Sequence, residues 1–283
     1  MSTSKQILRI ATHLAILPLL AGIAYSADVP VPIYSVTEAI ALKKQDTRTI
    51  YVDTRNEKEF LAAHIPSSVN IPLHFVKAKA YLKGMKSILI NQGYNLDQLH
   101  REGGILQQRG FDVAILAGGI AAWHQQGQPL ESEDFGEQDF SLISGAALMH
   151  KNSGSFFSLM VDISAADQRE EEKQSVFPGT VIRHPVRGKE DASKLFDVIR
   201  NHDLDARDSI LIVENNGEYS QLKSLAKRCK PTVFFLKGGL QEYQRQLERQ
   251  RAMLQPREKR LKKVGGCSSC PSALGQNRVK EKF

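Results

Sequence analysis

The segment Ile50-Tyr51-Val52-Asp53-Thr54-Arg55 passes from three apolar residues to an acid and a base, and the run AHIPSSVNIP follows it at 63–72. A short apolar run that stops at polar residues predicts a buried strand. The chain continues with a β-branched run at 87–90, a helical pattern at 96–108 and another strand before the pair Gly118-Gly119. Strands that alternate with helices at these lengths predict a parallel β-sheet covered by helices on both faces.

The same order of elements occurs a second time. Its matching features are Leu159-Met160-Val161-Asp162, the FPG run at 177–179, the β-branched run at 209–213, a helical stretch at 220–229 and the pair Gly238-Gly239. The two glycine pairs lie 120 residues apart. A repeat of this length predicts two α/β domains, which we place at 34–130 and 140–252, with a linker over 128–138.

Composition limits the class of protein. The chain has 283 residues, is 41% hydrophobic and contains 20 Gly and 11 Pro, as expected of a globular protein rather than a disordered or collagen-like one. Three cysteines are too few for a disulfide scaffold. The length predicts two domains, in agreement with the repeat.

The first 26 residues are typical of a secretory signal peptide. Lys5 and Arg9 precede an apolar stretch at 10–24, and Ala24-Tyr25-Ser26 offers small residues for cleavage before Ala27. The apolar stretch is shorter than the ~20 residues needed to span a membrane. We therefore expect a periplasmic or secreted protein, with an uncleaved N-terminal membrane anchor as the alternative.

The positive charge is concentrated at the C-terminus. Residues 241–283 hold eleven Lys and Arg against four Asp and Glu, whereas residues 27–240 have a net charge of −2. The basic tail at 253–283 could bind an anionic membrane surface or an acidic partner, or it could be solvated. Nucleic-acid binding is not expected, because no aromatic residues are interleaved with these charges.

Several motifs together resemble the rhodanese-homology family. In the first copy they are Val52-Asp53-Thr54-Arg55, Glu59-Phe60, His64-Ile65-Pro66, Val69-Asn70-Ile71-Pro72 and Gly118-Gly119-Ile120-Ala121-Ala122-Trp123. The second copy is similar through Val161-Asp162, Phe177-Pro178-Gly179 and Gly238-Gly239-Leu240. The whole chain thus resembles a tandem rhodanese, an arrangement typical of thiosulfate and mercaptopyruvate sulfurtransferases.

The resemblance implies a sulfur-transfer mechanism that needs a cysteine, and this chain has no cysteine at the corresponding positions. In the family, a cysteine at the end of the central strand becomes a persulfide, within a loop of the form Cys-x-x-Gly-x-Arg-Ser whose N–H groups hold the sulfur's charge. Here the second copy has Glu214-Asn215-Asn216-Gly217, with Glu214 in the place of the cysteine. The first copy has Asn91-Gln92-Gly93, with either Ile90 or Asn91 in that place. We therefore expect no catalytic residue at these positions.

The remaining motif residues are interpreted as structural. Asp53 and Arg55 could act as an acid and its partner, but the family pattern favours an ion pair or hydrogen-bonded brace beneath the loop. His64 is expected to bond backbone groups in a turn, because no second His or Cys lies at metal-ligand spacing. Gly118, Gly119, Gly238 and Gly239 are expected to be structural, and we predict no metal or cofactor.

Cys267 and Cys270 form a Cys-x-x-Cys pair after two glycines. This spacing suits a small disulfide or flexible dithiol, a thioredoxin-like redox site, or half of a metal site. The pair could also fold back to a loop and carry a persulfide. From the sequence we expect an exported binding or regulatory module that is not an enzyme, with an unknown periplasmic protein or thiol partner. The alternative is a periplasmic sulfurtransferase or thiol-redox protein that uses Cys267 and Cys270.

Overall fold

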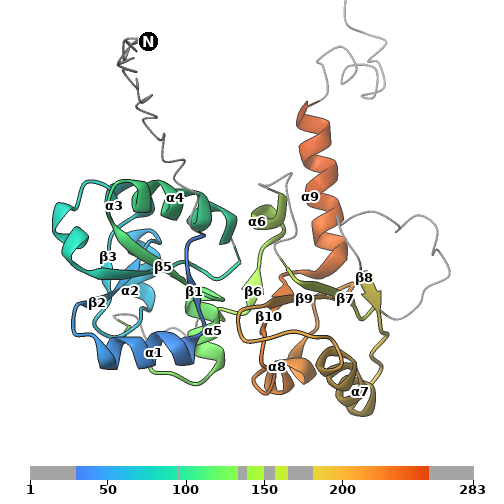
Figure 1. The fold of residues 1–283 in the computed structure, drawn as a ribbon. Helices are drawn as coiled ribbons and strands as arrows, with labels where there is room; N and C mark the ends of the chain where they lie inside the picture. Colours follow the sequence, from blue (N-terminus) through green and yellow to red (C-terminus); the bar gives the residue numbers. More distant parts are fainter. Residues whose placement is uncertain (1–29, 95, 133–138, 150–156, 165–180, 255–283) are drawn as a thin grey trace, which may run out of the picture.

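The computed structural model describes residues 30–94, 96–132, 139–149, 157–164 and 181–254. The predicted signal peptide at 1–26 and residues 255–283 of the predicted tail, with Cys267 and Cys270, lie outside the described residues. Two five-stranded sheets form the fold, and each is flanked by helices (Figure 1). The prediction of parallel sheets covered by helices is therefore confirmed.

The first sheet has the strand order β1-β5-β4-β2-β3, and all its pairings are parallel. Its elements are β1 (Ile33–Tyr34), α1 (Val36–Gln45), β2 (Thr49–Asp53), α2 (Glu57–Ala62), β3 (Val69–Asn70), α3 (Leu73–Val76), η1 (Ala80–Gly84), β4 (Lys86–Ile90), α4 (Leu96–Gln108), β5 (Asp112–Leu116) and α5 (Gly119–Gln125). Helix α1 begins with a capping box, in which Ser35 and Glu38 each bond the other's backbone N–H. The central strands β2 and β4 are almost wholly buried, as a sheet covered on both faces requires.

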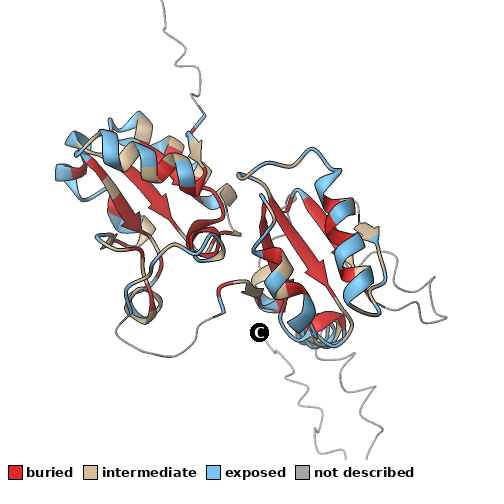
Figure 2. Ribbon diagram, turned by 90° about the horizontal axis from the view of Figure 1, so that it is seen from below, coloured by how far each residue is buried: buried red, intermediate tan, exposed pale blue. Residues whose placement is uncertain are grey.

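The second sheet repeats the order of the first, β6-β10-β9-β7-β8, again with parallel pairings. Its elements are β6 (Leu142–Ile143), α6 (Gly145–Met149), β7 (Leu159–Asp162), β8 (Val181–Arg183), α7 (Lys189–Arg200), β9 (Ser209–Val213), α8 (Ser220–Ala226), β10 (Thr232–Leu236) and α9 (Gly239–Leu254). Every residue of β9 and β10 is buried. Figure 2 shows this as a buried strand layer between exposed helix faces in both halves of the molecule.

The two halves share part of their core. One hydrophobic cluster contains Ile90 and Leu116 of the first sheet together with Phe234 and Leu236 of the second. The ring of Tyr94 meets the ring of Phe234 edge-on, with centroids 5.8 Å apart. Buried apolar contact of this kind is a strong constraint on the relative position of two domains.

Polar contacts also join the halves. The side-chain amide of Gln125, at the end of α5, donates to the carbonyl of Pro231 at 3.0 Å and accepts from the N–H of Val233 at 2.9 Å. Arg207 forms an ion pair with Glu38 at 2.6 Å, and its hydrogen bond lowers the pKa of Glu38 to about 2. No helix within the described ranges is both long enough and apolar enough to cross a bilayer.

Candidate functional site

The two loops that leave the carboxyl ends of the central strands are equivalent in their backbone bonding. The carbonyl of Ile90 accepts from the N–H of Thr54, and that of Val213 accepts from Ile163. One residue later, the carbonyl of Asn91 accepts from Ile120, and that of Glu214 accepts from Leu240. Asn91, rather than Ile90, is therefore the counterpart of Glu214, since Ile90 is the fully buried last residue of β4.

The loop after β9 encloses the carboxylate of its own first residue. The backbone N–H groups of Asn216, Gly217 and Glu218 donate to one oxygen of Glu214 at 2.6, 2.7 and 3.1 Å. Consecutive N–H groups that converge on one point form an anion-binding nest. In this loop the bound anion is an internal side chain.

The hydroxyl of Tyr219 connects this loop to β10. The hydroxyl accepts from the backbone N–H of Glu214 and donates to the carbonyl of Leu236, both at 3.0 Å. Burial raises the pKa of Tyr219 well above its usual range, so the hydroxyl stays protonated and continues to donate. The loop is thus fixed to β10 by a buried neutral bridge.

The loop after β4 has a shorter form of the same arrangement. The side-chain oxygen of Asn91 accepts from the N–H of Gly93 at 2.8 Å. Gly93 has φ +115°, a conformation that residues with a side chain rarely adopt. Both predicted loop segments therefore bond back to the side chain at the strand end, an amide in one and a carboxylate in the other.

The second glycine of each pair lies directly against a loop. A Cβ on Gly119 would lie 2.3 Å from the carbonyl oxygen of Asn91, and one on Gly239 would lie 2.4 Å from that of Glu214. Both contacts are shorter than a Cβ atom tolerates. These glycines, with Gly118 and Gly238 before them, allow the helix after the last strand to approach the loop.

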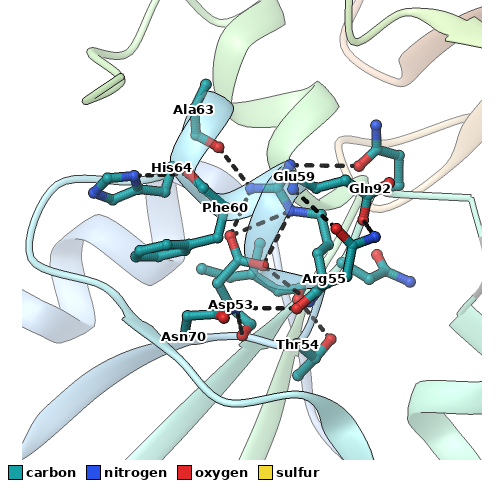
Figure 3. Close-up of polar contacts among 12 residues, drawn as sticks. Asp53, Thr54, Arg55, Glu59, Phe60, Ala63, His64, Asn70 and Gln92 are labelled. Carbon is teal, nitrogen blue, oxygen red and sulfur yellow. Dashed lines mark hydrogen bonds and ion pairs between the residues drawn. The ribbon is translucent and has the colours of Figure 1, made fainter. Parts of the chain in front are cut away.

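Beneath the first loop, Asp53 and Arg55 form a buried ion pair (Figure 3). The Arg55 guanidinium donates through Nη2 to Asp53 at 2.6 Å and to the carbonyl of Ala63 at 2.7 Å, while Nη1 lies 3.5 Å from the side-chain oxygen of Gln92. The two side chains are 0% and 3% exposed. A pair so placed connects β2, the end of α2 and the loop.

His64 lies at the edge of the same domain, at a distance from the loop (Figure 3). Its Nδ1 is 3.0 Å from the carbonyl of Phe60, and its ring stacks on the Phe60 ring. Its backbone forms an antiparallel bridge with Glu131, and its Nε2 lies 3.3 Å from the Glu131 carboxylate. The start of the predicted linker is thus bonded to the first domain.

The comparison with protein families found a match in the first domain. The model for the rhodanese-like domain matches residues 35–126, which contain the strands, the first loop and the buried ion pair described above. Residues 35–126 are a rhodanese-like domain. A comparison with curated protein sequences found no match.

Several solved structures are similar to parts of the chain. A protein from Bacillus halodurans is 25% identical, with 36% of this chain and 77% of that chain covered and a TM-score of 0.32. A rhodanese-related protein from Thermoplasma volcanium is 23% identical over 36% and 99% of the two chains, with a TM-score of 0.31. The thiosulfate sulfurtransferase of Pseudomonas aeruginosa is 17% identical over 75% of this chain and 44% of that chain, with a TM-score of 0.30.

The second half differs from the first domain in a residue that lies beneath the loop. The backbone N–H of Ser164 donates to Asp162 at 2.9 Å, as that of Arg55 donates to Asp53 at 3.0 Å. Ser164 therefore stands where the first domain has its arginine, and it brings no positive charge. The loop of the second half is braced by Tyr219 instead.

Sequence reasoning missed the internal carboxylate ligand of the second loop. An acid followed by three polar or small residues at a strand end is the available signal, because such a side chain can accept from N–H groups two to four positions ahead. No group of three or more potential metal ligands occurs in the described parts of the chain. Cys229 is half-buried and lies three residues after the end of α8.

Cys229 is expected to be an unreactive thiol, because burial raises its pKa to about 11. At pH 8 its thiolate fraction is about 100-fold below that of a thiol at the ordinary value near 9. We expect alkylation by iodoacetamide to be slowed by at least this factor and to accelerate up to about pH 11. The measurement uses a Cys267→Ser/Cys270→Ser variant, with the urea-unfolded chain as reference; equal rates in both states would contradict it.

Proposed function

We propose that this chain is an exported protein with two rhodanese-like domains that acts as a binding or regulatory module rather than as a standard sulfurtransferase. One observation carries the proposal. The carboxylate of Glu214 accepts the three N–H groups of its own loop, at the strand end where a sulfurtransferase needs its thiolate. The loop therefore has neither a sulfur nucleophile nor free N–H groups to hold a persulfide.

The electrostatics of this loop also oppose the usual sulfur donor. Thiosulfate is a dianion, and Glu214 is followed by Glu218 within the same loop. Each carboxylate repels it by about 1 kcal/mol or more at a few ångströms, depending on the local dielectric. In the first domain the corresponding residue, Asn91, has an amide that cannot attack a sulfane sulfur.

The second half is included as a rhodanese-like domain because its sheet has the same strand order and its glycine pair the same contact with the loop. Export is included because of the predicted signal peptide. Both domains keep the sheet and the glycine contacts but have altered loops, which is an arrangement suited to recognition of a partner. The partner we expect is a periplasmic protein or thiol-containing molecule.

The test is an assay of residues 27–283 for sulfur transfer from thiosulfate and from mercaptopyruvate to cyanide, with the chain reduced beforehand. We expect no turnover above background. A Cys267→Ser/Cys270→Ser variant is assayed in parallel. Turnover that disappears in this variant would contradict the proposal and identify an enzyme whose nucleophile is in its C-terminal segment.

A Glu214→Cys substitution tests whether the second loop can still hold an anion. The three N–H groups that now bind the carboxylate would stabilise a thiolate, so we expect the pKa of the introduced thiol to lie at least about one unit below the ordinary value near 9. The measurement is the pH dependence of iodoacetamide reactivity in the Cys267→Ser/Cys270→Ser background. Glu218→Cys is the matched control, and equal titration of the two thiols would show that the loop is no anion cradle.

A further inference from the structure

One layer of the first domain, formed by α3, η1 and α4, faces away from the second domain. These helices share a hydrophobic cluster with alternate strand residues such as Leu89, and the cluster contains first-domain residues only. Ile88 and Ile90, which alternate with Leu89, belong instead to the cluster shared with the second domain. Figure 1 shows α3 and α4 on one side of the first sheet and α1 on the other. The contact between the domains therefore leaves this layer uncovered.

The segment at 74–84 in this layer is anchored by two side chains and exposes the rest. Only Val76 and Leu82 are buried within it, and the other nine residues are exposed. Phe75 and Tyr81 are 53% and 55% exposed. Five large apolar side chains are exposed in the described parts of the chain, and three of them, these two and Ile105 of α4, belong to this layer. Exposed apolar side chains gathered on one face are typical of a surface that contacts another molecule.

The same segment is positively charged. The sequence has no Asp or Glu from 60 to 96, and this stretch contains four lysines, Lys77, Lys79, Lys83 and Lys86. Lys86 forms an ion pair with Asp112 at 3.0 Å. The ion pairs among the described residues include none of the other three lysines. Lys83 lies over the ring of Phe111, 5.3 Å from its centroid, a contact that leaves the charge uncompensated. Three positive charges thus lie on the segment that carries the two exposed aromatic rings.

The composition of this segment favours a membrane over a protein as the partner. Protein interfaces are depleted in lysine and gather their apolar side chains at a centre that excludes water. Here Lys77 and Lys79 stand between Phe75 and Tyr81 in the chain. Membrane-bound surfaces combine lysine with aromatic residues, because the ring enters the headgroup layer while the ammonium group on its long stem stays beside the lipid phosphates. A second copy of this surface is a poor partner, since like charges would meet.

We propose that this surface, formed by the exposed residues of 74–84, binds an anionic lipid bilayer. Phe75 and Tyr81 enter the headgroup layer, and Lys77, Lys79 and Lys83 lie beside the lipid phosphates. The inference goes beyond the proposed function because it assigns a membrane contact to the first domain. It depends neither on the basic C-terminal segment nor on whether either loop transfers sulfur.

The first experiment measures sedimentation of residues 27–283 with lipid vesicles at about 0.15 M salt. The vesicles contain phosphatidylcholine alone or with about 30% phosphatidylglycerol, and we expect clear binding to the anionic vesicles only. Equal binding to both kinds of vesicle, or binding to neither, would overturn the proposal.

A triple lysine variant locates the binding surface. Each lysine beside an anionic surface raises the affinity about five-fold, so Lys77→Gln/Lys79→Gln/Lys83→Gln is expected to weaken binding by a factor on the order of 100. Lys259→Gln/Lys262→Gln/Lys263→Gln removes the same charge from the C-terminal segment and is the matched control. A loss no greater than that of the control would overturn the proposal.

A tryptophan introduced by Tyr81→Trp reports contact with lipid directly, because the native Trp123 is buried and gives a constant background. Anionic vesicles are expected to shift the emission of the new tryptophan to shorter wavelength and to protect it from quenching by acrylamide. Gln45→Trp is the matched control, since Gln45 is exposed at the end of α1 on the other side of the sheet. Equal responses of the two variants would contradict the proposed orientation and overturn the proposal.

The variant Phe75→Ala/Tyr81→Ala separates a membrane from an acidic protein partner. It keeps all three lysines but removes the rings, and we expect it to weaken binding to anionic vesicles at least about ten-fold. Melting temperatures equal to that of the unmodified chain show that each variant is folded. Unchanged vesicle binding would show that only the charges act, as expected of a surface for an acidic protein, and would overturn the proposal.

Discussion

Replacement of Arg55 by methionine is expected to lower the free energy of unfolding by about 3–5 kcal/mol. The Arg55 side chain is 3% exposed, and its guanidinium donates hydrogen bonds to Asp53 and to the carbonyl of Ala63. Methionine fills much of the same volume but leaves the fully buried Asp53 carboxylate without a counter-charge. The measurement is urea denaturation followed by far-ultraviolet circular dichroism.

Two further variants separate the effect of the unpaired Asp53 charge on the free energy of unfolding from the effect of lost packing. Asp53→Asn/Arg55→Met removes both charges, and we expect it to recover at least about 1 kcal/mol relative to Arg55→Met because no buried charge remains unpaired. Arg48→Met breaks the ion pair of Arg48 with Asp46, in which the arginine side chain is 75% exposed. That loss is expected to be at most about 1 kcal/mol. Equal losses for Arg48→Met and Arg55→Met would show that Arg55 is not a structural brace.

Replacement of Phe234 by alanine is expected to destabilise both halves of the molecule. Phe234 is fully buried in β10, and its ring meets Tyr94 of the first domain and Phe157 of the second. Removal of a buried phenylalanine side chain costs about 3–5 kcal/mol. Because the lost contacts lie on both sides of the domain boundary, we expect the first domain to unfold at lower urea concentration as well.

Trp123 makes this second prediction measurable. It is the only tryptophan of the chain, it is buried in α5 of the first domain, and it belongs to the cluster shared with Phe234. Phe235→Ala is the matched control, because Phe235 is equally buried but packs into a cluster composed of second-half residues. We expect Phe234→Ala to lower the midpoint of the Trp123 fluorescence transition more than Phe235→Ala does. The reverse order would contradict a shared core.

Much of the fold could be predicted from local patterns. The segments at 87–90 and 113–117 are apolar and β-branched, and they form β4 and β5 within a residue or two of the predicted bounds. The sequence predicts a strand before each glycine pair, and β5 and β10 do end just before Gly118 and Gly238. Such predictions succeed because strand periodicity and glycine requirements depend on near neighbours in the chain.

The sites could be predicted only in part. The resemblance predicted the site at the residues after β4 and β9, but only the backbone bonds to Thr54 and Ile120 distinguish Ile90 from Asn91 as the counterpart of Glu214. Those bonds join segments about 30 residues apart.

The sequence by itself thus determined the parallel α/β architecture, its repetition, and the lack of a cysteine at either strand end, all of which are properties of residue type and local order. Tertiary structure decided the rest. It placed the Glu214 carboxylate where the N–H groups of its own loop donate to it, buried Arg55 against Asp53, and bonded Gln125 of α5 to the backbone of the second domain. These outcomes depend on loop conformation and on contacts between distant segments, whose energies no local pattern of residues encodes.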